Sequence, residues 1–423
     1  MPLNFYTRTT CRLCNSTGLL CVLSLKSTPL EDDYLPKIRA AQSLQKFPLK
    51  VMLCQECGNA QLSNVIMPES IYDNHYIYQT SSSPGLKEHF EKVCKHLIEK
   101  THLPANSCVV DIGCNDGILL EHFRNMNMQI IGVEPSIVAE IAKKKNLQIY
   151  QSFFDANTAQ SILSEHGKIS LITASNVVAN IDDLDRFIET VKILMGRNSV
   201  FVIETGYWGS LVKNSVFDFI YHEHLNYFTI KSLSIFFKKH DMHLFDVELV
   251  ETKGGSARMY VQLNHGNHNE FSSVSEFIKT EENDELFQIE TYERFYNRLE
   301  TAKTKCHQLL DNLGAQKEVI AGYGASTSVT TLLHLFELGD RIHFLVDDNP
   351  LKHNTVSPGY HLPVYPSTAL CEYSIKYALI LPWRFSESIV SRNRVFMENG
   401  GRFLEVYPEP SLVKTQHFVA SVS

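Results

Sequence analysis

The pattern of apolar and polar residues changes character along the chain. The first 70 residues hold short apolar runs among cysteines and prolines, with little of the 3.6-residue period of a helix. Residues 88–100 are amphipathic with helical spacing. Apolar runs of strand type then alternate with helical stretches as far as residue 204. The pattern predicts strands at 107–112, 129–133, 171–174 and 199–204, and a helix at 118–125.

A third region begins near residue 245. It opens with two strand-like runs, FDVELVET and ARMYVQLN, and continues as a long charged helical region over 274–313. Strands alternating with helices are typical of a parallel, doubly wound sheet, and the alternation returns after residue 317. We therefore predict an α/β protein of three units, 1–70, 71–244 and 245–423. The expected elements of the last unit are strands at 318–321, 342–346 and 377–381 and a helix at 330–338.

Composition narrows the functional classes. Of 423 residues, 44% are hydrophobic and 20% are charged, as in ordinary globular proteins. The formal net charge of −8 argues against the basic surface that binds nucleic acid. No apolar run reaches the roughly 18 residues that span a bilayer, and the N-terminus lacks the basic and then apolar pattern of a signal peptide. We expect a cytoplasmic protein without membrane or nucleic-acid partners.

Four of the ten cysteines form two C-x-x-C pairs, Cys11 with Cys14 and Cys54 with Cys57. Each pair makes a turn that presents two sulfur atoms to one point, so together they can hold a tetrahedral zinc ion. The alternatives are reduced, metal-free pairs or a redox pair. The segment between the pairs has little apolar core, and a metal would add folding energy there. With four cysteine ligands the zinc would be structural, since no coordination position stays open.

A glycine-rich turn follows the strand expected at 107–112. The run Asp111-Ile-Gly113-Cys-Asn115-Asp-Gly117 departs from the G-x-G-x-x-G spacing of a pyrophosphate site. Its position after a parallel strand is typical of a nucleotide-like ligand. The next strand is followed by Glu134, an acid placed to accept both hydroxyls of a ribose. A tight strand-to-helix turn without a ligand is the plainer interpretation of the glycines.

Titratable side chains alternate in the run Tyr221-His222-Glu223-His224. The two histidines lack the i, i+4 spacing of a helical zinc site. An imidazole titrates near neutral pH and an adjacent carboxylate can orient it, so the run favours a general base. Two surface histidines beside a partly buried tyrosine remain the alternative.

Taken in order, these motifs resemble one family, the three-domain sugar C-methyltransferases that act on nucleotide-linked 4-keto-deoxysugars. D-x-G-x-x-x-G resembles the first motif of class I S-adenosylmethionine-dependent methyltransferases. The resemblance covers nearly the whole chain. It includes both C-x-x-C pairs, Pro29-Leu30, Pro48-Leu49, Gln61-Leu62, Tyr76-Ile77-Tyr78 before Ser81–Ser83, D-I-G-C-N-D-G, Y-H-E-H, Gly254-Gly255-Ser256 with Arg258, Gly322-Tyr323-Gly324-Ala325, Asp347-Asp348-Asn349-Pro350 with Lys352, and Pro358-Gly359.

The resemblance implies a zinc-binding domain, a class I methyltransferase domain and a C-terminal Rossmann-like domain. It implies that S-adenosylmethionine binds near Asp111, Gly113, Asn115, Gly117, Glu134 and Asn176. His224 would take the proton from the sugar carbon beside the ketone, and Glu223 and Tyr221 would orient it and the substrate. Tyr76 or Tyr78 would reach the sugar. The enolate so formed would attack the sulfonium methyl, with no metal at the reacting centre.

One position departs from the family pattern N-V-x-A-H-I. The run here is Asn176-Val-Val-Ala-Asn180-Ile, and Asn180 can hydrogen-bond a sugar oxygen but cannot titrate. The departure leaves the identity of the sugar and the stereochemistry open.

The segment Gly322-x-Gly324 is also incomplete as a dinucleotide motif, because residue 327 is threonine. It favours binding of the nucleotide sugar, with Tyr323 nearby and Lys352, Arg258 and Arg384 as candidate phosphate ligands.

Three other functions stay open at this point. The chain could methylate a different acceptor, since Asn180 alters the site. It could be a nicotinamide-dependent oxidoreductase that uses the C-terminal unit, or a zinc-ribbon interaction module whose α/β domains have lost catalysis. For the methyltransferase we expect a monomer or a weak homo-oligomer.

Overall fold

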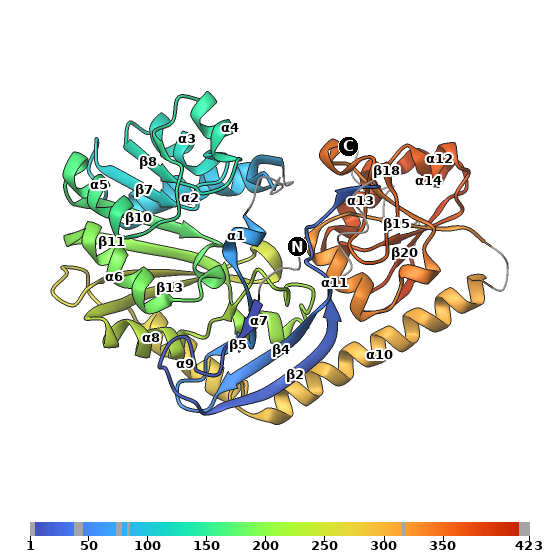
Figure 1. Cartoon of the computed structure of the whole chain (residues 1–423), viewed down its shortest axis with the longest axis horizontal. Coiled ribbons are helices and arrows are strands. Elements are labelled where there is room, and N and C mark those ends of the chain that lie inside the picture. The colour runs from blue at the N-terminus through green and yellow to red at the C-terminus, as the bar shows by residue number, and fades with distance from the viewer. Residues whose placement is uncertain (1–4, 38–44, 73–77, 83–84, 315–317, 414–423) are drawn as a thin grey trace, which may run out of the picture.

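The computed structural model describes residues 5–37, 45–72, 78–82, 85–314 and 318–413. Two α/β lobes lie side by side, and the N-terminal strands and one long helix run beneath both of them (Figure 1). Within the described residues, no helix is both long and apolar enough to cross a membrane.

The N-terminal unit is a small antiparallel sheet that borrows a strand from the next unit. Its strand order is β12-β5-β4-β2, and β12 comes from residues far along the chain. Two short ladders, β1 with β6 and β3 with β17, flank it. The bounds are β1 Phe5–Thr7, β2 Leu19–Thr28, β3 Leu35–Pro36, β4 Phe47–Cys54, β5 Ala60–Leu62, β6 Asn64–Ile66, β12 Asn226–Tyr227 and β17 Thr355–Val356.

A seven-stranded sheet of order β13-β14-β11-β10-β7-β8-β9 forms the first lobe. Neighbours from β11 to β9 pair in parallel, as the sequence predicts, and β14 and β13 add an antiparallel edge. Its strands are β7 Cys108–Ile112, β8 Gln129–Val133, β9 Ile149–Tyr150, β10 Ile169–Ser175, β11 Met195–Gly206, β13 Met242–Val250 and β14 Ser256–Leu263. Its helices are α1 Pro68–Ile71, α2 Leu86–Lys100, α3 Ile118–Asn125, α4 Ala139–Lys144, α5 Ala156–His166, α6 Leu184–Leu194, α7 Trp208–Lys213 and α8 Ile230–Lys239.

The boundary expected at residue 245 does not divide the structure. The two runs assigned from sequence to the third unit are β13 and β14, and β14 pairs with β11 in the middle of the first lobe. Hydrophobic alternation identifies a strand but not its sheet, because pairing partners are set by tertiary contacts. The structure therefore assigns residues 242–263 to the seven-stranded sheet of the first lobe.

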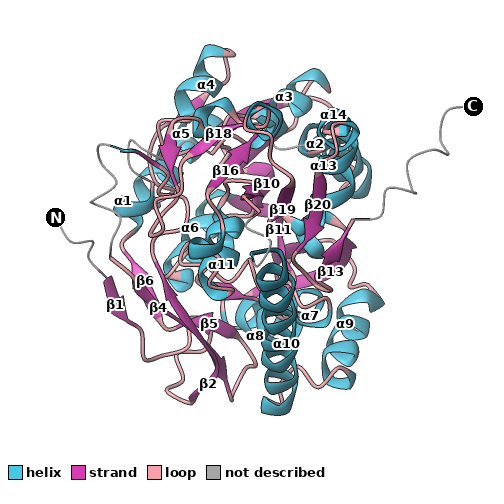
Figure 2. Ribbon diagram, turned by 90° about the vertical axis from the view of Figure 1, so that its right-hand side faces the viewer, coloured by secondary structure: helices cyan, strands magenta, loops and turns pink. Residues whose placement is uncertain are grey.

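The second lobe carries a six-stranded sheet of order β18-β16-β15-β19-β20-β21, parallel except for β21. The helical region expected over 274–313 is two helices: α9, which packs on α8 and β13, and α10, which packs on β2 (Figure 2). The strands are β15 Ile320–Tyr323, β16 Phe344–Asp347, β18 Val364–Pro366, β19 Tyr377–Ile380, β20 Arg402–Glu405 and β21 Ser411–Leu412. The helices are α9 Ser272–Asn283, α10 Ile289–Gly314, α11 Thr327–Leu335, α12 Ala369–Glu372, α13 Ser386–Arg392 and α14 Arg394–Glu398.

Aromatic packing joins the lobes. The ring of Phe217, in the loop after α7, stacks on Phe336 at the end of α11, with centroids 5.2 Å apart and planes 1° from parallel. Tyr407 meets the Phe217 ring edge-on and donates its hydroxyl to the carbonyl of Ser215. Both phenylalanines and Tyr407 are buried, so this contact removes a large apolar area from water. The loop that follows Phe217 is thereby fixed between the lobes.

A buried arginine ties the N-terminal unit to the first lobe. The Arg12 side chain is fully buried, its Nε donates to Asp182 at 2.8 Å, and its Nη1 donates to the carbonyls of Leu62 and Leu225. Tyr6 also donates to the Asp182 carboxylate. Asp182 thus supplies the counter-charge for a guanidinium that has left water.

Replacing Asp182 with alanine leaves the Arg12 charge buried and unpaired. Removing one partner of such a pair costs about 3 kcal/mol, so we expect the free energy of unfolding to fall by that amount in urea titrations. Glu91→Ala is the control, because Glu91 forms an exposed pair with Lys95 and the variant should unfold at close to the wild-type urea concentration. Equal effects of the two variants would contradict this account of Arg12.

Candidate active site

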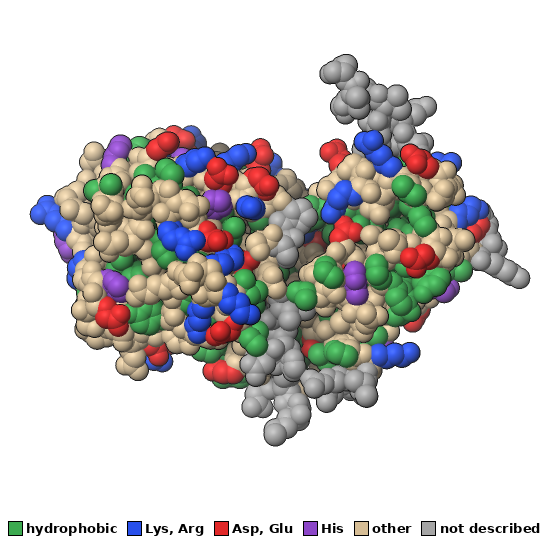
Figure 3. Space-filling view, turned by 90° about the horizontal axis from the view of Figure 1, so that it is seen from above, with side chains coloured by type: hydrophobic (Ala, Val, Ile, Leu, Met, Phe, Trp, Pro, Cys, Tyr) green, Lys and Arg blue, Asp and Glu red, His purple; other side chains and the backbone are tan. Residues whose placement is uncertain are grey.

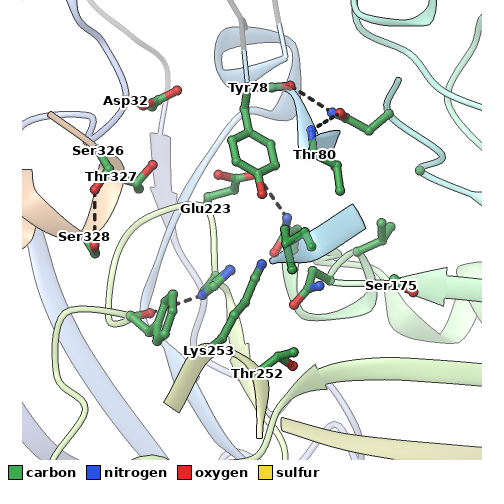
Figure 4. A pocket seen from close by; sticks show the side chains of 18 of the residues that line it. Asp32, Tyr78, Thr80, Ser175, Glu223, Thr252, Lys253, Ser326, Thr327 and Ser328 are labelled. Atoms are coloured by element: carbon green, nitrogen blue, oxygen red, sulfur yellow. Dashed lines mark hydrogen bonds between the residues drawn. The ribbon is translucent and has the colours of Figure 1, made fainter. Parts of the chain in front are cut away.

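A cavity of about 2150 Å³ lies where the three units meet, and side chains from all of them line it. A hollow between the two lobes is visible in the space-filling view (Figure 3). The loop after β7, the Tyr221–His224 run and the loop before α11 all contribute lining residues. Glu223 lies between Thr80 and Ser175 on one side and Ser326, Thr327 and Ser328 on the other (Figure 4). The motifs singled out in the sequence therefore share one space.

The glycine-rich loop connects β7 to α3 and needs both of its glycines. Gly113 has φ 71°, and a Cβ there would lie 2.3 Å from the Val177 side chain. Gly117 has φ 79°, and its Cβ would lie 2.3 Å from Leu147. Gly113 lines the cavity, whereas Gly117 lies outside the lining and lets α3 pack closely against its neighbours.

Two acids stand beside this loop in different roles. Glu134 lines the cavity, and its carboxylate accepts from the backbone N–H groups of Asn115, at 3.1 Å, and Ser136, at 2.9 Å. These bonds aim a carboxylate at the position that a ribose would take. Asp111 is buried behind the loop and accepts from Thr173 at 2.7 Å, and burial raises its pKa to about 7. An acid that lines the cavity beside a glycine-rich loop fits S-adenosylmethionine, and the role of Glu134 as its ribose ligand stays a prediction. Asp111 lies outside the lining and supports the neighbouring strand through Thr173.

The two asparagines expected at the cofactor also line the cavity. The Asn115 side chain donates to the carbonyl of Tyr78 and accepts from the N–H of Thr80, so it holds the segment before α2 over the cavity (Figure 4). Asn176 has φ 58° and donates its backbone N–H to the carbonyl of Glu204 at 2.7 Å. Both therefore shape the backbone around the expected cofactor.

The Tyr221–His224 run divides between cavity and core. Tyr221, Glu223 and His224 line the cavity, whereas His222 is fully buried and absent from the lining. The Nδ1 of His222 lies 2.6 Å from the carboxylate of Glu31, which comes from the N-terminal unit. His222 therefore anchors the run while its neighbours face the cavity.

His224 is held in one tautomer. Its Nδ1 lies 3.2 Å from the carbonyl of Phe219 and must donate, which leaves Nε2 to accept from the Tyr221 hydroxyl at 3.0 Å. The rings of His224 and Tyr221 lie 4.1 Å apart. Burial and then the charge of Lys253 lower the pKa of His224 to about 3. The imidazole is therefore neutral, with its accepting nitrogen toward Tyr221, at physiological pH.

Glu223 belongs to a polar cluster with Tyr72 and Asn180. Its Oε1 accepts from the Tyr72 hydroxyl at 3.0 Å and from the Asn180 amide at 3.2 Å, and that amide also donates to Tyr72 at 2.9 Å. Burial raises the pKa of Glu223 to about 7, against the Tyr72 hydrogen bond. The Asn180 Oδ1 is buried without a hydrogen bond in the described structure, so it has a free acceptor position. Tyr78 lines the cavity, and Tyr76 lies outside the described residues.

The far end of the cavity is the start of α11. Gly324 has φ 110°, and a Cβ there would lie 2.6 Å from Pro382. Asp347, at the end of β16, accepts from the N–H groups of Ala325 and Asn349 and fixes the loop. Ser326 at the helix N-cap makes no side-chain capping bond, so the first N–H groups of α11 lack that partner. Tyr323 donates to Asp348 at 2.7 Å beside this loop.

The three candidate phosphate ligands line the cavity but already have carboxylate partners. Arg258 forms a buried pair with Glu204 at 2.7 Å. Lys352 pairs with Asp32 at 2.8 Å and lies over the Tyr34 ring. Arg384 pairs with Asp218 and stacks on Phe219, 4.4 Å from the ring centroid. A phosphate would have to share these charges, and their role as phosphate ligands stays a prediction.

Sequence reasoning missed several lining residues. Tyr72 is an aromatic residue near the end of a short helix and carried no recognisable signal. Lys253 precedes the Gly254-Gly255 pair that the analysis did single out, so the position was available and its charge was overlooked. The segment 153–155, including Asp155 at the N-cap of α5, lines the cavity beside Glu134.

The four cysteines of the two C-x-x-C pairs come together, as predicted. Their sulfur atoms all lie within 4.8 Å of one another, with Cys11 and Cys57, and Cys14 and Cys54, each 3.5 Å apart. Tetrahedral zinc with bonds of about 2.3 Å requires sulfur separations of about 3.8 Å, so the cluster fits the metal. The cluster is not among the cavity-lining residues, which fits a structural metal.

The cluster predicts one zinc ion per chain. Cys54→Ser should lose the metal and lower the melting temperature, because the N-terminal unit has a small core of its own. Cys371→Ser is the matched control, since Cys371 is exposed and outside the cluster. Metal content by mass spectrometry of the purified proteins checks this, and unchanged zinc in Cys54→Ser would contradict it.

Comparison with known proteins agrees with this geometry. Family models match three successive parts of the chain: a zinc binding domain at residues 11–72, a methyltransferase domain at 86–244 and a C-methyltransferase C-terminal domain at 251–408. The glycine-rich loop between β7 and α3 lies within the part of the chain that matches the methyltransferase domain.

Individual relatives differ in how much they cover. The C-methyltransferase NovU of Streptomyces niveus is 30% identical over 408 residues, 96% of this chain and 97% of NovU. A ubiquinone biosynthesis O-methyltransferase of Rhodopseudomonas palustris is 26% identical over 98 residues, 23% of this chain and 39% of that enzyme. The crystal structure of a magnesium protoporphyrin IX methyltransferase from Synechocystis is similar with a TM-score of 0.33 and 15% identity, over 41% of this chain and 82% of that one. Because the match to NovU spans nearly all of both chains, this protein belongs to the family of S-adenosylmethionine-dependent C-methyltransferases.

Proposed function

We propose that the enzyme adds a methyl group to C-3 of a nucleotide-linked 4-keto-deoxysugar. The observation that carries the proposal is the single cavity, which joins a cofactor loop, a cluster of titratable groups and a nucleotide-type loop in that order. A nucleotide sugar has a matching layout, because its reacting ring and its nucleotide lie at opposite ends of a diphosphate. The motif resemblance to sugar C-methyltransferases supports the same acceptor.

At the cofactor end, bound S-adenosylmethionine supplies an electrophilic methyl group on a sulfonium. Glu134 would accept from its ribose hydroxyls, and the backbone at Gly113 allows the ligand to approach the loop closely. The segment held by Asn115 covers this end and limits the access of water. These residues bind and orient, and none of them takes part in proton transfer.

In the middle of the cavity, His224 is the base. Burial keeps His224 neutral, so its imidazole can accept the proton from the carbon beside the ketone. Because that C–H group is a weak acid and the same burial weakens the base, the enolate oxygen needs stabilisation as it forms. Its bond to Phe219 fixes the ring so that Nε2 receives the proton. Tyr221 donates to that nitrogen in the free protein, so its hydroxyl holds the ring orientation until the substrate arrives.

The cluster of Glu223, Tyr72 and Asn180 positions the sugar. Glu223 accepts from both neighbours, which leaves the Asn180 Oδ1 as an unused acceptor for a sugar hydroxyl. Asparagine in place of histidine at this position keeps the hydrogen-bonding capacity but removes a titratable group. The sugar is thus oriented by a cluster that includes only one carboxylate.

At the far end, the nucleotide diphosphate lies against the start of α11. The N–H groups of the first helical turn and the positive end of the helix dipole attract a phosphate. The same loop could hold a nicotinamide cofactor, which is the runner-up function. The family membership argues for the methyltransferase, and a test with NAD(H) separates the two.

The test is a methyl-transfer assay with dTDP-, CDP- and GDP-linked 4-keto-deoxysugars, read by mass spectrometry for a gain of one methylene. We expect product with at least one donor and a thermal shift with S-adenosylhomocysteine. His224→Ala should lower kcat by about 10²–10⁴-fold and leave the thermal shift unchanged. His243→Ala, which removes a partly buried histidine paired with Glu270, is the control. Normal turnover by His224→Ala would overturn the assignment of the base, and a shift with NAD(H) alone would favour the oxidoreductase.

The pH dependence should report Glu223 and not His224. His224, with a pKa of about 3, is neutral across the usual range, whereas Glu223, with a pKa raised to about 7, ionises as the pH rises through neutrality. The ionised carboxylate is the better acceptor for Tyr72 and Asn180, so kcat/KM should rise with pH up to about 7. In Glu223→Gln we expect a lower kcat/KM that is flat between pH 5.5 and 8. Persistence of the acidic limb in that variant would assign it to another group.

A further inference from the structure

Lys253 lies in a backbone turn that directs its side chain into the cavity. It sits in the turn between β13 and β14, with φ 55°, followed by Gly254 with φ 82° and Gly255 with φ 117°. Three successive left-handed residues are rare, and the first of them carries a side chain that disfavours this conformation. Figure 4 shows Lys253 and Glu223 entering the cavity from different elements.

The turn is rigid because its other side is packed and hydrogen-bonded. Gly255 donates to the carbonyl of Thr252 at 3.0 Å, and its own carbonyl accepts from the N–H of Tyr207 at 3.1 Å. A Cβ on Gly254 would lie 2.9 Å from Val216, and one on Gly255 would lie 2.4 Å from Ser210. The two glycines thus pack closely against the protein, and Lys253 is the basic residue that the turn contributes to the cavity lining, beside Thr252 and Gly254.

The Lys253 ammonium has no hydrogen bond or ion pair to any described residue. Arg258, Lys352, Arg384 and Arg392, which also line the cavity, are each paired with a carboxylate. Lys92 and Arg186 lack ion pairs too, but both are exposed, whereas Lys253 is partly buried. An unneutralised cation inside a cavity is costly unless a ligand supplies negative charge there.

The charge of Lys253 acts on the groups of the proposed reaction. It contributes to the low pKa of His224, and the carboxylates of Glu223 and Glu204 act on Lys253 in turn, while burial lowers its pKa. Lys253 therefore lies in the electrostatic environment of the base. The charge of Arg384, which also lines the cavity, lowers the pKa of Lys253 as well.

We propose that Lys253 is a catalytic residue that stabilises the enolate oxygen of the acceptor, an inference that rests on the proposed function. His224 takes the proton from the carbon beside the carbonyl, and the C–H electron pair becomes the C=C bond of the enolate. The carbonyl π pair moves to oxygen, where the Lys253 ammonium compensates the new negative charge. The C=C pair would then form the bond to the methyl group that bound S-adenosylmethionine supplies, the oxygen pair would re-form the carbonyl, and the electron pair of the broken S–CH₃ bond would stay on sulfur. A preorganised charge of this kind is effective because it needs no rearrangement during the reaction.

Proton exchange isolates this step from methyl transfer. The wild-type enzyme is incubated in D₂O with a nucleotide-linked 4-keto-deoxysugar and with S-adenosylhomocysteine in place of the methyl donor. It should exchange the proton beside the carbonyl for deuterium, which mass spectrometry measures as a gain in mass of the sugar. Lys253→Met keeps an unbranched side chain one atom shorter than lysine and removes the charge. We expect it to slow both exchange and kcat by about 10²–10³-fold, as for loss of an oxyanion donor, with KM changed by less than about threefold.

Two further variants test alternative explanations. Lys253→Arg keeps the charge and should retain exchange within about tenfold of the wild type. Lys213→Met, on α7 and exposed, should match the wild type in every measurement. The thermal shift with S-adenosylhomocysteine should be the same in all variants. If Lys253→Arg lost as much exchange as Lys253→Met and both variants also lost the thermal shift, Lys253 would have a structural role and the proposal would be overturned.

The outcomes separate the two proposals. Wild-type exchange rates in Lys253→Met would overturn the role of Lys253 and leave the proposed function standing. A rise in KM of tenfold or more with kcat unchanged would make Lys253 a phosphate ligand and also overturn the inference. If the wild type neither exchanges nor methylates any nucleotide-linked 4-keto sugar, the proposed function itself fails.

Discussion

The contact on which the active site depends is the buried pair between Glu31 and His222. Both side chains are removed from water, so each needs the other as a hydrogen-bond partner. Glu31 comes from the N-terminal unit and His222 from the loop after α7. Glu31 also accepts from the Thr28 hydroxyl, and its carbonyl accepts from Thr330 in α11 of the second lobe. One residue thus connects all three units. The residues on either side of His222 face the cavity because His222 itself is held in the core.

This arrangement lets the N-terminal unit shape the cavity, although its cysteine cluster lies outside the cavity lining. The cysteine cluster fixes two turns, and Arg12, within the first turn, is the buried cation paired with Asp182. From there β2 leads to Thr28 and Glu31, and Glu31 holds the loop that carries His222 and His224. A structural metal can in this way determine the geometry of a distant imidazole, because each link is a buried polar contact with a single favourable arrangement.

The sequence predicted those parts of the molecule that local patterns encode. The alternation of the first lobe, the cysteine cluster and the placement of Glu134 and His224 on one cavity follow from spacing and residue type. Other features depend on tertiary contacts and could not be read in this way. The pairing of β14 with β11, the direction of His222 toward Glu31, and the approach of Tyr72 to Asn180 each join residues more than 50 positions apart. The carboxylate partners of Arg258, Lys352 and Arg384 could not be predicted either, because they too are distant in sequence.

The crossing of β13 and β14 back into the first lobe has a consequence for protein engineering. Matches of sequence place a joint between modules at about residue 250, but a chimaera fused there would separate β14 from the sheet to which it belongs and leave β13 without its partner strand. An exchange of acceptor-recognition modules between relatives should instead be joined in the loop after Leu263. In such a hybrid, Lys253 would come from the module before the joint and α11 from the module after it. Under the proposed function, the residues around the reacting sugar and those around its nucleotide could then be exchanged independently.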